Sequence, residues 1–181
     1  MHLPDLTFDL VTDRGVFSGD RVDPGTKLLL TDVPMPSDLT GNVLDLGCGY
    51  GAIAVALAKR APATTVWALD VNARARELTA ENAVSAGVAR RVRVVAAADV
   101  PDDVEFRAIY SNPPIRVGKF ALRELLLAWL GRLAPDGRAW FVVQKHLGSD
   151  SLAAWMRTQG YTVDRFGSRM GYRLLEVRQP R

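Results

Sequence analysis

The chain has 181 residues, of which 48% are hydrophobic and 24% charged, so it is long enough for one domain with a full core. Its single cysteine excludes an internal disulfide and suits a reducing cytoplasm. No apolar run approaches the roughly 20 residues of a membrane span, and no signal peptide is visible. We therefore expect one cytoplasmic domain over residues 1–181, with residues 1–40 as a lead-in arm and helix and residues 41–181 as the main sheet.

The net charge of +3 is unevenly distributed along the chain. Residues 1–106 carry 10 Lys and Arg against 15 Asp and Glu, giving −5, whereas residues 107–181 carry 13 against 5, giving +8. A basic second half is typical of a protein with an anionic partner such as nucleic acid. Scattered solvated arginines explain the same numbers equally well, because no run exceeds two adjacent basic residues.

The first 40 residues predict an arm and one helix. Residues 5–17 mix alternating apolar positions with the turn signal Asp13-Arg14-Gly15, which indicates a short hairpin or an extended arm. A helix is expected from about Lys27, because the polar segment Asp23-Pro24-Gly25-Thr26 lies just ahead of it and Pro34-Met35-Pro36 ends it.

The rest of the chain is organised around a glycine-rich stretch. An apolar run ending in an acid is followed by three alternating glycines and a small-residue segment, namely Asp45, Gly47, Gly49, Gly51 and residues 52–58. This pattern indicates a buried parallel strand, a tight turn and a helix packed closely on the sheet. Glycine lets the backbone turn sharply and approach a ligand without an intervening side chain.

A second apolar run, Thr65 to Leu69, ends in Asp70, nineteen residues after Gly51. An acid at about 20 residues from such a turn is placed to accept hydrogen bonds from a ribose. The spacing G-x-G-x-G differs from the G-x-G-x-x-G that binds a dinucleotide, and no Gly-Lys-Ser/Thr follows for a triphosphate. The first half therefore predicts a site for a nucleoside-containing cofactor.

Strands and helices alternate through the remaining sequence. The expected elements are a helix over 73–86 with Asn72 as its N-cap, strands over 91–97 and 106–110, a helix with its apolar face at 122–133, a strand over 138–144 after the turn 135–137, a helix over 149–159 and an antiparallel pair at 161–166 and 172–177. This order predicts an α/β fold: a doubly wound, mostly parallel seven-stranded sheet with a C-terminal antiparallel hairpin.

In such a sheet ligands bind beyond the carboxyl ends of the strands. Four polar residues, Asp45, Asp70, Asp99 and Asn112, follow or end predicted strands. We therefore expect them to meet at one edge of the sheet.

The segment Asp45-Leu46-Gly47-Cys48-Gly49-Tyr50-Gly51, followed by Asp70 and Asn112-Pro113-Pro114-Ile115, resembles a class I S-adenosylmethionine-dependent methyltransferase, a Rossmann-like enzyme. Ile115 within Ser111 to Lys119, and the lead-in from Val16 to Thr26, are similar to the small-domain methyltransferases of guanine N2 in ribosomal RNA. The resemblance covers residues 8–178 and corresponds to the catalytic half of those enzymes alone.

This resemblance implies S-adenosyl-L-methionine as cofactor. The residues it places against the cofactor are Gly25, Thr26, Asp45, Gly47, Gly49, Gly51, Asp70, Asn72, Asp99 and Asn112. Three of them have a competing structural interpretation: Thr26 and Asn72 as helix caps, and Asp99 as an exposed acid at a strand end. No metal is expected.

Asn112 and Pro113 are the candidate catalytic residues. The lone pair of an exocyclic base amine is delocalised into the ring, so two acceptors aimed at its protons favour a reactive nitrogen as positive charge develops. The Asn112 side-chain oxygen and the Pro113 carbonyl supply such acceptors. The fixed φ of Pro113 and Pro114 holds them in place, whereas a plain proline turn explains the prolines but not the asparagine.

Four residues beside this motif are candidate substrate contacts. Pro114 and Ile115 are expected against the base, and Arg116 and Lys119 against phosphates, with a solvated helix start as the alternative for Lys119. Phe17 would supply an aromatic face only if the lead-in covers the site, and we favour a core position for it.

We expect an enzyme that methylates an exocyclic base amine in RNA, most simply guanine N2 in rRNA, presented naked or in a ribosomal particle. The main alternative is an N5-glutamine methyltransferase of a protein, because that amide offers the same two donors. A non-catalytic cofactor-binding RNA module is a second alternative, and the glycine spacing disfavours a nicotinamide dehydrogenase. The oligomeric state is not predicted.

Overall fold

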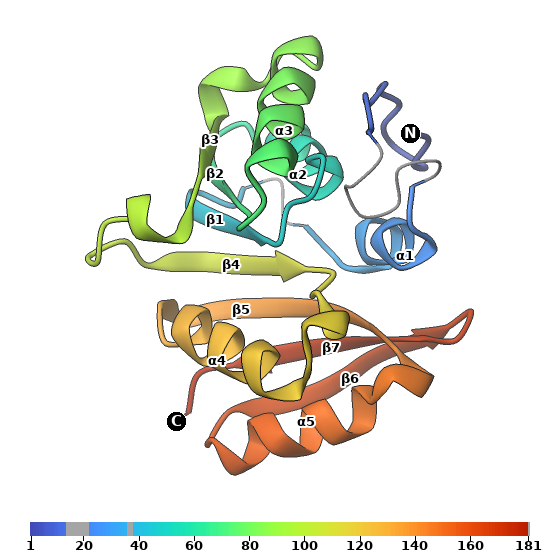
Figure 1. The fold of residues 1–181 in the computed structure, drawn as a ribbon, viewed down its shortest axis with the longest axis vertical. Helices are drawn as coiled ribbons and strands as arrows, with labels where there is room; N and C mark the ends of the chain where they lie inside the picture. Colours follow the sequence, from blue (N-terminus) through green and yellow to red (C-terminus); the bar gives the residue numbers. More distant parts are fainter. Residues whose placement is uncertain (14–21, 36–37, 181) are drawn as a thin grey trace.

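The computed structural model describes residues 1–13, 22–35 and 38–180, without the side chain of Arg116. The predictions for Phe17 and for the turn after Asp13 fall outside these residues. Figure 1 shows one sheet with helices on both sides. Its strands are β1 (Gly41–Leu46), β2 (Thr64–Leu69), β3 (Val92–Val95), β4 (Phe106–Ser111), β5 (Leu133–Gln144), β6 (Thr162–Arg169) and β7 (Tyr172–Arg178).

The helices are α1 (Pro24–Asp32), α2 (Ala52–Arg60), α3 (Ala73–Ser85), α4 (Lys119–Leu130) and α5 (Ser149–Thr158). In the described residues, short 3₁₀ turns lie between elements: η1 (Ala89–Arg91), η2 (Ala97–Asp99), η3 (Ile115–Val117) and η4 (Lys145–Leu147). None of the helices in the described ranges is long and apolar enough to cross a membrane.

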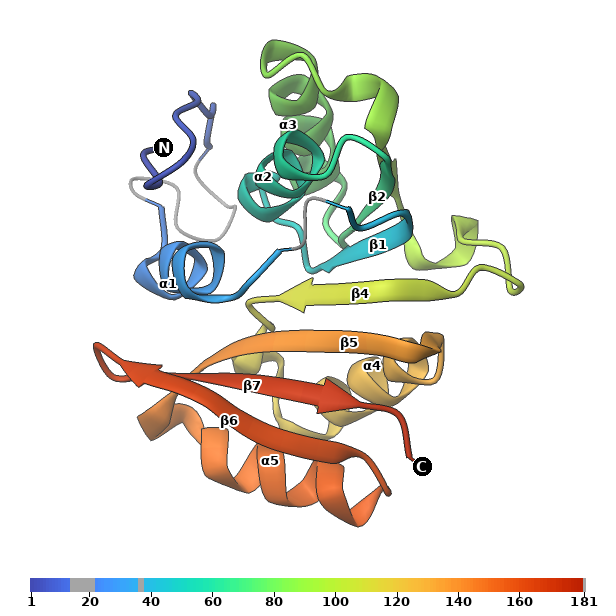
Figure 2. The same ribbon diagram turned by 180° about the vertical axis from the view of Figure 1, so that it is seen from behind.

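The strand order is β3-β2-β1-β4-β5-β7-β6. The first five strands pair in parallel, while β7 pairs antiparallel with both β5 and β6. The predicted doubly wound sheet with a closing antiparallel pair is therefore confirmed. Figure 2 shows β7 inserted between β5 and β6. The chain order reverses between β1 and β4, so their carboxyl ends form the switch point at which such sheets bind ligands.

Successive strand residues face opposite sides of the sheet, and two separate cores result. Val43 packs in the cluster with α1 and α2, whereas its neighbour Leu44 packs in the cluster with α4 and α5. Both side chains are almost completely buried, as expected for strands covered on both faces.

The start of β5 and the end of β3 differ from the sequence expectation. β5 starts at Leu133, because the expected turn over 135–137 is a register shift within the strand: Phe106 pairs with Leu133 and Ala108 with Arg138. β3 ends at Val95, so Asp99 lies in η2 and not at a strand end.

The first residues of the arm contain a turn that the sequence did not predict. An isolated antiparallel bridge joins His2 and Thr7, and the backbone amide of Leu3 donates to the carbonyl of Leu6. A tight turn therefore lies at residues 3–6.

Candidate functional site

The glycine turn after β1 adopts the left-handed backbone conformations that its glycines allow. Gly47, Gly49 and Gly51 have φ of 78°, 57° and 88°. The amides of Gly47 and Cys48 both donate to the carbonyl of Leu69, at 2.8 and 2.9 Å. These bonds attach the turn to the end of β2, so the turn and Asp70 form one rigid unit.

Asp70 accepts a backbone hydrogen bond on each carboxylate oxygen. Gly49 N donates to Oδ2 and Asn72 N donates to Oδ1, both at 2.9 Å. Each carboxylate oxygen has a second lone pair, so Asp70 keeps acceptor capacity toward a ligand. The side chain of Asn72 accepts from Arg74 N at 2.9 Å, which confirms it as the N-cap of α3.

Asp45 is completely buried and faces α2 instead of the cavity. Its Oδ2 accepts from Ala54 N at 2.9 Å, and no partner for Oδ1 is found among the described residues. Burial raises the pKa of Asp45 to about 8; the Ala54 amide lowers it and the nearby charge of Asp70 raises it. Asp45 thus holds the start of α2 against the glycine turn.

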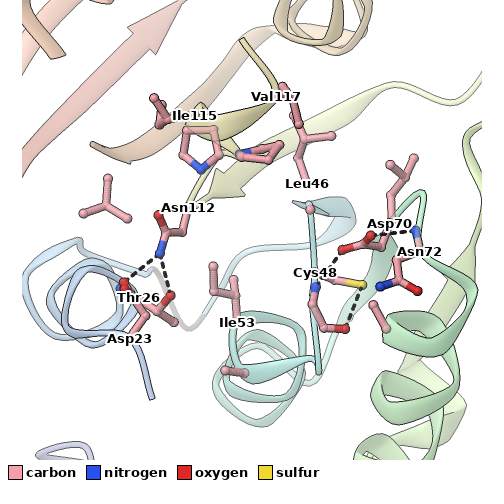
Figure 3. A pocket seen from close by; sticks show the side chains of 18 of the residues that line it. Asp23, Thr26, Leu46, Cys48, Ile53, Asp70, Asn72, Asn112, Ile115 and Val117 are labelled. Atoms are coloured by element: carbon pink, nitrogen blue, oxygen red, sulfur yellow. Dashed lines mark hydrogen bonds between the residues drawn. The ribbon is translucent and has the colours of Figure 1, made fainter. Parts of the chain in front are cut away.

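The side-chain amide of Asn112 is held by the beginning of α1. Its Nδ2 donates to Asp23 Oδ2 at 2.7 Å and to Thr26 Oγ1 at 3.0 Å. Figure 3 shows the nitrogen directed at these two residues and the oxygen directed away from them. Both amide protons are therefore used, and no partner for Oδ1 is found in the described part of the chain.

The two prolines after Asn112 fix the next carbonyl. Ile115 N donates to the Pro113 carbonyl at 2.8 Å, and Pro114 between them has φ −75° and ψ 73°. These are the dihedrals of an inverse γ-turn, which suits the restricted φ of proline. The Pro113 carbonyl thus accepts from Ile115 N with one lone pair, and its second lone pair remains available as an acceptor.

A cavity of about 330 Å³ lies between these groups. Figure 3 shows Asn112 on one wall and Asp70 with Asn72 on the other. Apolar side chains form much of the rest, including Leu46, Ile53, Leu69, Val71, Ile115, Val117, Leu125, Val142 and Leu147. The volume and the mainly apolar wall with a few polar groups are typical of a small-molecule site.

Nine of the predicted site residues line this cavity: Thr26, Gly47, Gly49, Asp70, Asn72, Asn112, Pro113, Pro114 and Ile115. They come from four separate chain segments that the sheet brings to one edge.

The other predicted residues are placed elsewhere. Gly25, Asp45, Gly51, Asp99 and Lys119 are not among the described residues that line the cavity. Asp99 is exposed and its Oδ2 accepts from Ala96 N at 3.2 Å, because β3 stops before it and the chain turns into η2. Gly51 packs against α3, where an added Cβ would lie 2.9 Å from Thr79 Cγ2. A direct cofactor contact of these residues stays a prediction.

Thr26 is not the cap of α1. The cap is Asp23, whose carboxylate accepts from Thr26 N at 3.0 Å. The first turn of α1 can pack against Tyr172 only because residue 25 is glycine: a Cβ there would lie 2.5 Å from the ring atom Cε1 of Tyr172. Arg116 lies in η3, and its side chain is outside what the structure describes.

Sequence reasoning missed four polar residues of the cavity wall: Asp23, Tyr50, Gln144 and Tyr172. Gln144 Nε2 donates to the Tyr172 hydroxyl at 3.0 Å, because β5 and β7 pair these two residues directly. An Asp-Pro pair ahead of a helix signals a cap at Asp23, but no local pattern signals its contact with Asn112.

Comparison with known proteins identifies the family to which this chain belongs. The family model described as methyltransferase small domain matches residues 7–176. The uncharacterized Bacillus subtilis protein YbxB is 33% identical over 98% of this chain and 89% of its own length. Proteins named ribosomal RNA small subunit methyltransferase C are also similar. The one from Shewanella amazonensis is 33% identical over 84% of this chain and 45% of its own length. The one from Aeromonas hydrophila is 38% identical over 67% of this chain and 34% of its own length. This chain therefore spans less than half of these two rRNA methyltransferases.

Solved structures share the fold. A 16S rRNA N2 methyltransferase of T. thermophilus, in complex with AdoMet and guanosine, has a TM-score of 0.76 at 22% identity over 92% of this chain and 46% of that one. A ribosomal protein L11 methylase of Lactobacillus delbrueckii has a TM-score of 0.69 at 20% identity and covers 87% of this chain and 77% of its own. The predicted class of enzyme, an S-adenosylmethionine-dependent methyltransferase, is confirmed by the family match. The chain belongs to the methyltransferase small domain family.

Proposed function

We propose that this methyltransferase transfers a methyl group to an exocyclic amine of a base in RNA, namely N2 of a guanine in ribosomal RNA. The names of the Shewanella and Aeromonas relatives support an rRNA substrate. The T. thermophilus neighbour is an N2 methyltransferase that was solved with guanosine bound, which supports guanine N2 as the methylated atom. Such a substrate is consistent with a cytoplasmic enzyme.

The cavity residues fit S-adenosylmethionine, which supplies an electrophilic methyl group on a sulfonium when bound. Asp70 keeps lone pairs for ribose hydroxyls, and the apolar walls suit an adenine ring. At Gly47 the nearest atom to an added Cβ is Pro114 Cδ at 3.8 Å, so the absence of a side chain leaves room between the glycine turn and the Asn-Pro-Pro segment. Thr26 and Asn72 also line this space.

The observation that carries the proposal is the arrangement of acceptors at Asn112 and Pro113. Asn112 Oδ1 and one lone pair of the Pro113 carbonyl remain available on the cavity wall. Together they match the two protons of an exocyclic amine. Acceptors fixed before the substrate binds stabilise positive charge on the nitrogen without a reorganisation cost. No general base is required, because the methylated amine is acidic and releases its proton to water.

The surroundings of the cavity suit a nucleic acid strand. Ile115 and Val117 line the cavity, and Phe120, one turn further on at the start of α4, is 78% exposed. Lys119 and Lys145 are exposed, and neither has an ion pair among the described residues. An exposed ring and exposed cations that lie close in sequence to cavity residues can provide stacking for a base and contacts for phosphates. Because guanine N2 is hard to reach within a duplex, the target should be single-stranded or flipped out.

The competing substrate is the side-chain amide of a protein glutamine, which offers the same two protons to Asn112 and Pro113. Incubation of the enzyme with labelled cofactor and either rRNA or a release factor separates the two. We expect label in RNA with the wild type and with Asn42→Ala, a matched control at the start of β1, and a loss of about 10²-fold or more with Asn112→Ala. Label found only in protein would refute the RNA proposal.

A further inference from the structure

We propose that Asp23 is a positioning residue: its carboxylate fixes the side-chain amide of Asn112 so that the amide oxygen, and not the nitrogen, is presented to the substrate. The inference deepens the proposed function and rests on it. It is drawn from the contacts of Asp23, Gly25 and Thr26, at the start of α1, with Asn112 and Tyr172, which lie far from them in the sequence.

The chemistry of the two partners decides which way the amide of Asn112 faces. A carboxylate only accepts hydrogen bonds, whereas the Thr26 hydroxyl can both donate and accept. A reversed amide would place Asn112 Oδ1 where Nδ2 lies, 2.7 Å from the carboxylate of Asp23, and two acceptors would face each other. Thr26 at 3.0 Å tolerates either orientation. Asp23 alone therefore selects the orientation in which the oxygen is free.

Asp23 can impose this orientation because it is itself fixed. It is 8% exposed, and the same oxygen that receives Asn112 Nδ2 also accepts from Thr26 N as the cap of α1. The helix start cannot shift toward the sheet, because Gly25 lies against the ring of Tyr172 with no room for a Cβ. Figure 3 shows Asp23 and Thr26 together at the end of α1, facing Asn112.

The carboxylate also improves the acceptor. A hydrogen bond from an amide N–H to an ionised oxygen is stronger than one between neutral groups, and it polarises the amide so that its oxygen attracts protons more strongly. Asp23 therefore acts on the reacting amine through Asn112, without a contact of its own to the substrate.

An exchange of the two side chains tests this inference. Asn112→Asp alone places two carboxylates 2.7 Å apart, and we expect kcat to fall by about 10²-fold or more. In the double variant Asp23→Asn/Asn112→Asp, the new amide donates to the new carboxylate and leaves one oxygen of residue 112 directed away from α1. We expect the double variant to recover at least about tenfold in kcat over Asn112→Asp, since one positioned acceptor is restored.

Two further measurements separate positioning from a loss of structure. S-adenosylhomocysteine should bind Asp23→Asn within about threefold of the wild type by calorimetry, because Asn112, Asp70 and the glycine turn are unchanged. Asp23→Asn alone keeps a capping oxygen and should lower kcat by about tenfold, since residue 23 no longer selects one amide orientation. A double variant no more active than Asn112→Asp, or an unchanged kcat in Asp23→Asn, would overturn the inference.

A measurement without turnover keeps this inference distinct from the proposed function. In ¹⁵N-labelled wild type, the side-chain amide protons of Asn112 should exchange with solvent at least about tenfold more slowly than in Asp23→Ala. If the wild type methylates no RNA base but shows this protection, the proposed function fails, while the inference that Asp23 fixes the Asn112 amide is supported. Equal exchange rates in both proteins would refute the inference that Asp23 fixes the Asn112 amide.

Discussion

The buried carboxyl of Asp45 makes the stability of this protein depend on pH. Burial raises its pKa to about 8, from 3.8 for a free side chain. Below pH 3.8 the folded and unfolded states both hold the proton, and above pH 8 neither does. Between these values only the folded state holds it, so unfolding releases a proton and rising pH favours the unfolded state.

The size of the effect follows from the two pKa values. Each pH unit within this window costs about 1.4 kcal/mol, and the slope flattens near the folded-state pKa. From pH 6 to pH 8 the ionisation of Asp45 should therefore lower the free energy of unfolding by about 2 kcal/mol, which is about 5 °C in Tm for a domain of this size.

Asp45→Asn isolates this contribution. Its amide oxygen can still accept from Ala54 N, but the side chain no longer ionises. Urea denaturation at pH 6, 7, 8 and 9 should show a fall in unfolding free energy between pH 6 and 8 that is about 2 kcal/mol larger in the wild type than in the variant, since all other groups cancel in the comparison. Parallel curves for the two proteins would show that Asp45 is already ionised at pH 6 and would refute the reasoning.

Other predictions concern the cofactor site, the turn and the substrate side. Asp70→Asn should weaken binding of S-adenosylhomocysteine by at least about tenfold in calorimetry, because hydrogen bonds to a charged acceptor are lost; an unchanged Kd would remove Asp70 from the ribose site. Gly51→Ala should lower the free energy of unfolding by about 2 kcal/mol or more, because φ is +88° and a Cβ would meet Thr79. Gly87→Ala is the matched control, since it has a positive φ but open space and should cost about 1 kcal/mol; equal costs would contradict the packing argument. Phe120→Ala should weaken binding of single-stranded RNA by about tenfold in fluorescence anisotropy without changing cofactor affinity, and unchanged RNA binding would exclude stacking.

The positions of the strand ends could be predicted because the hydrophobic pattern of the sequence distinguishes strands from helices. Asp70 and Asn112 follow apolar runs of strand length, and parallel strands bring such ends to one edge of the sheet. The cavity accordingly contains both residues, together with two of the glycines of the turn.

The exceptions depend on information that a local pattern lacks. Asp45 occupies the same face of β1 as Val43, which is the face covered by α2, so its carboxylate bonds to Ala54 N and lies outside the cavity lining. Asp99 misses the cavity because β3 ends at Val95, and strand boundaries are the least certain part of any sequence interpretation.

The contacts that complete the site are long-range. Asp23 meets Asn112 across 89 positions of sequence, because α1 packs beside β5 and the start of β7. Gln144 meets Tyr172 because β7 enters the sheet between β5 and β6, and only the register of that pairing places the two opposite each other. Such pairings follow from tertiary packing and leave no periodic signal.

Mass spectrometry of rRNA nucleosides tests the central claim most directly. Three strains are compared: one with the gene, one without it, and one in which the gene carries Asn112→Ala. The proposed mechanism predicts N2-methylguanosine at a site that is modified in the first strain and unmodified in the other two. The same N2-methylguanosine content in all three strains would contradict it.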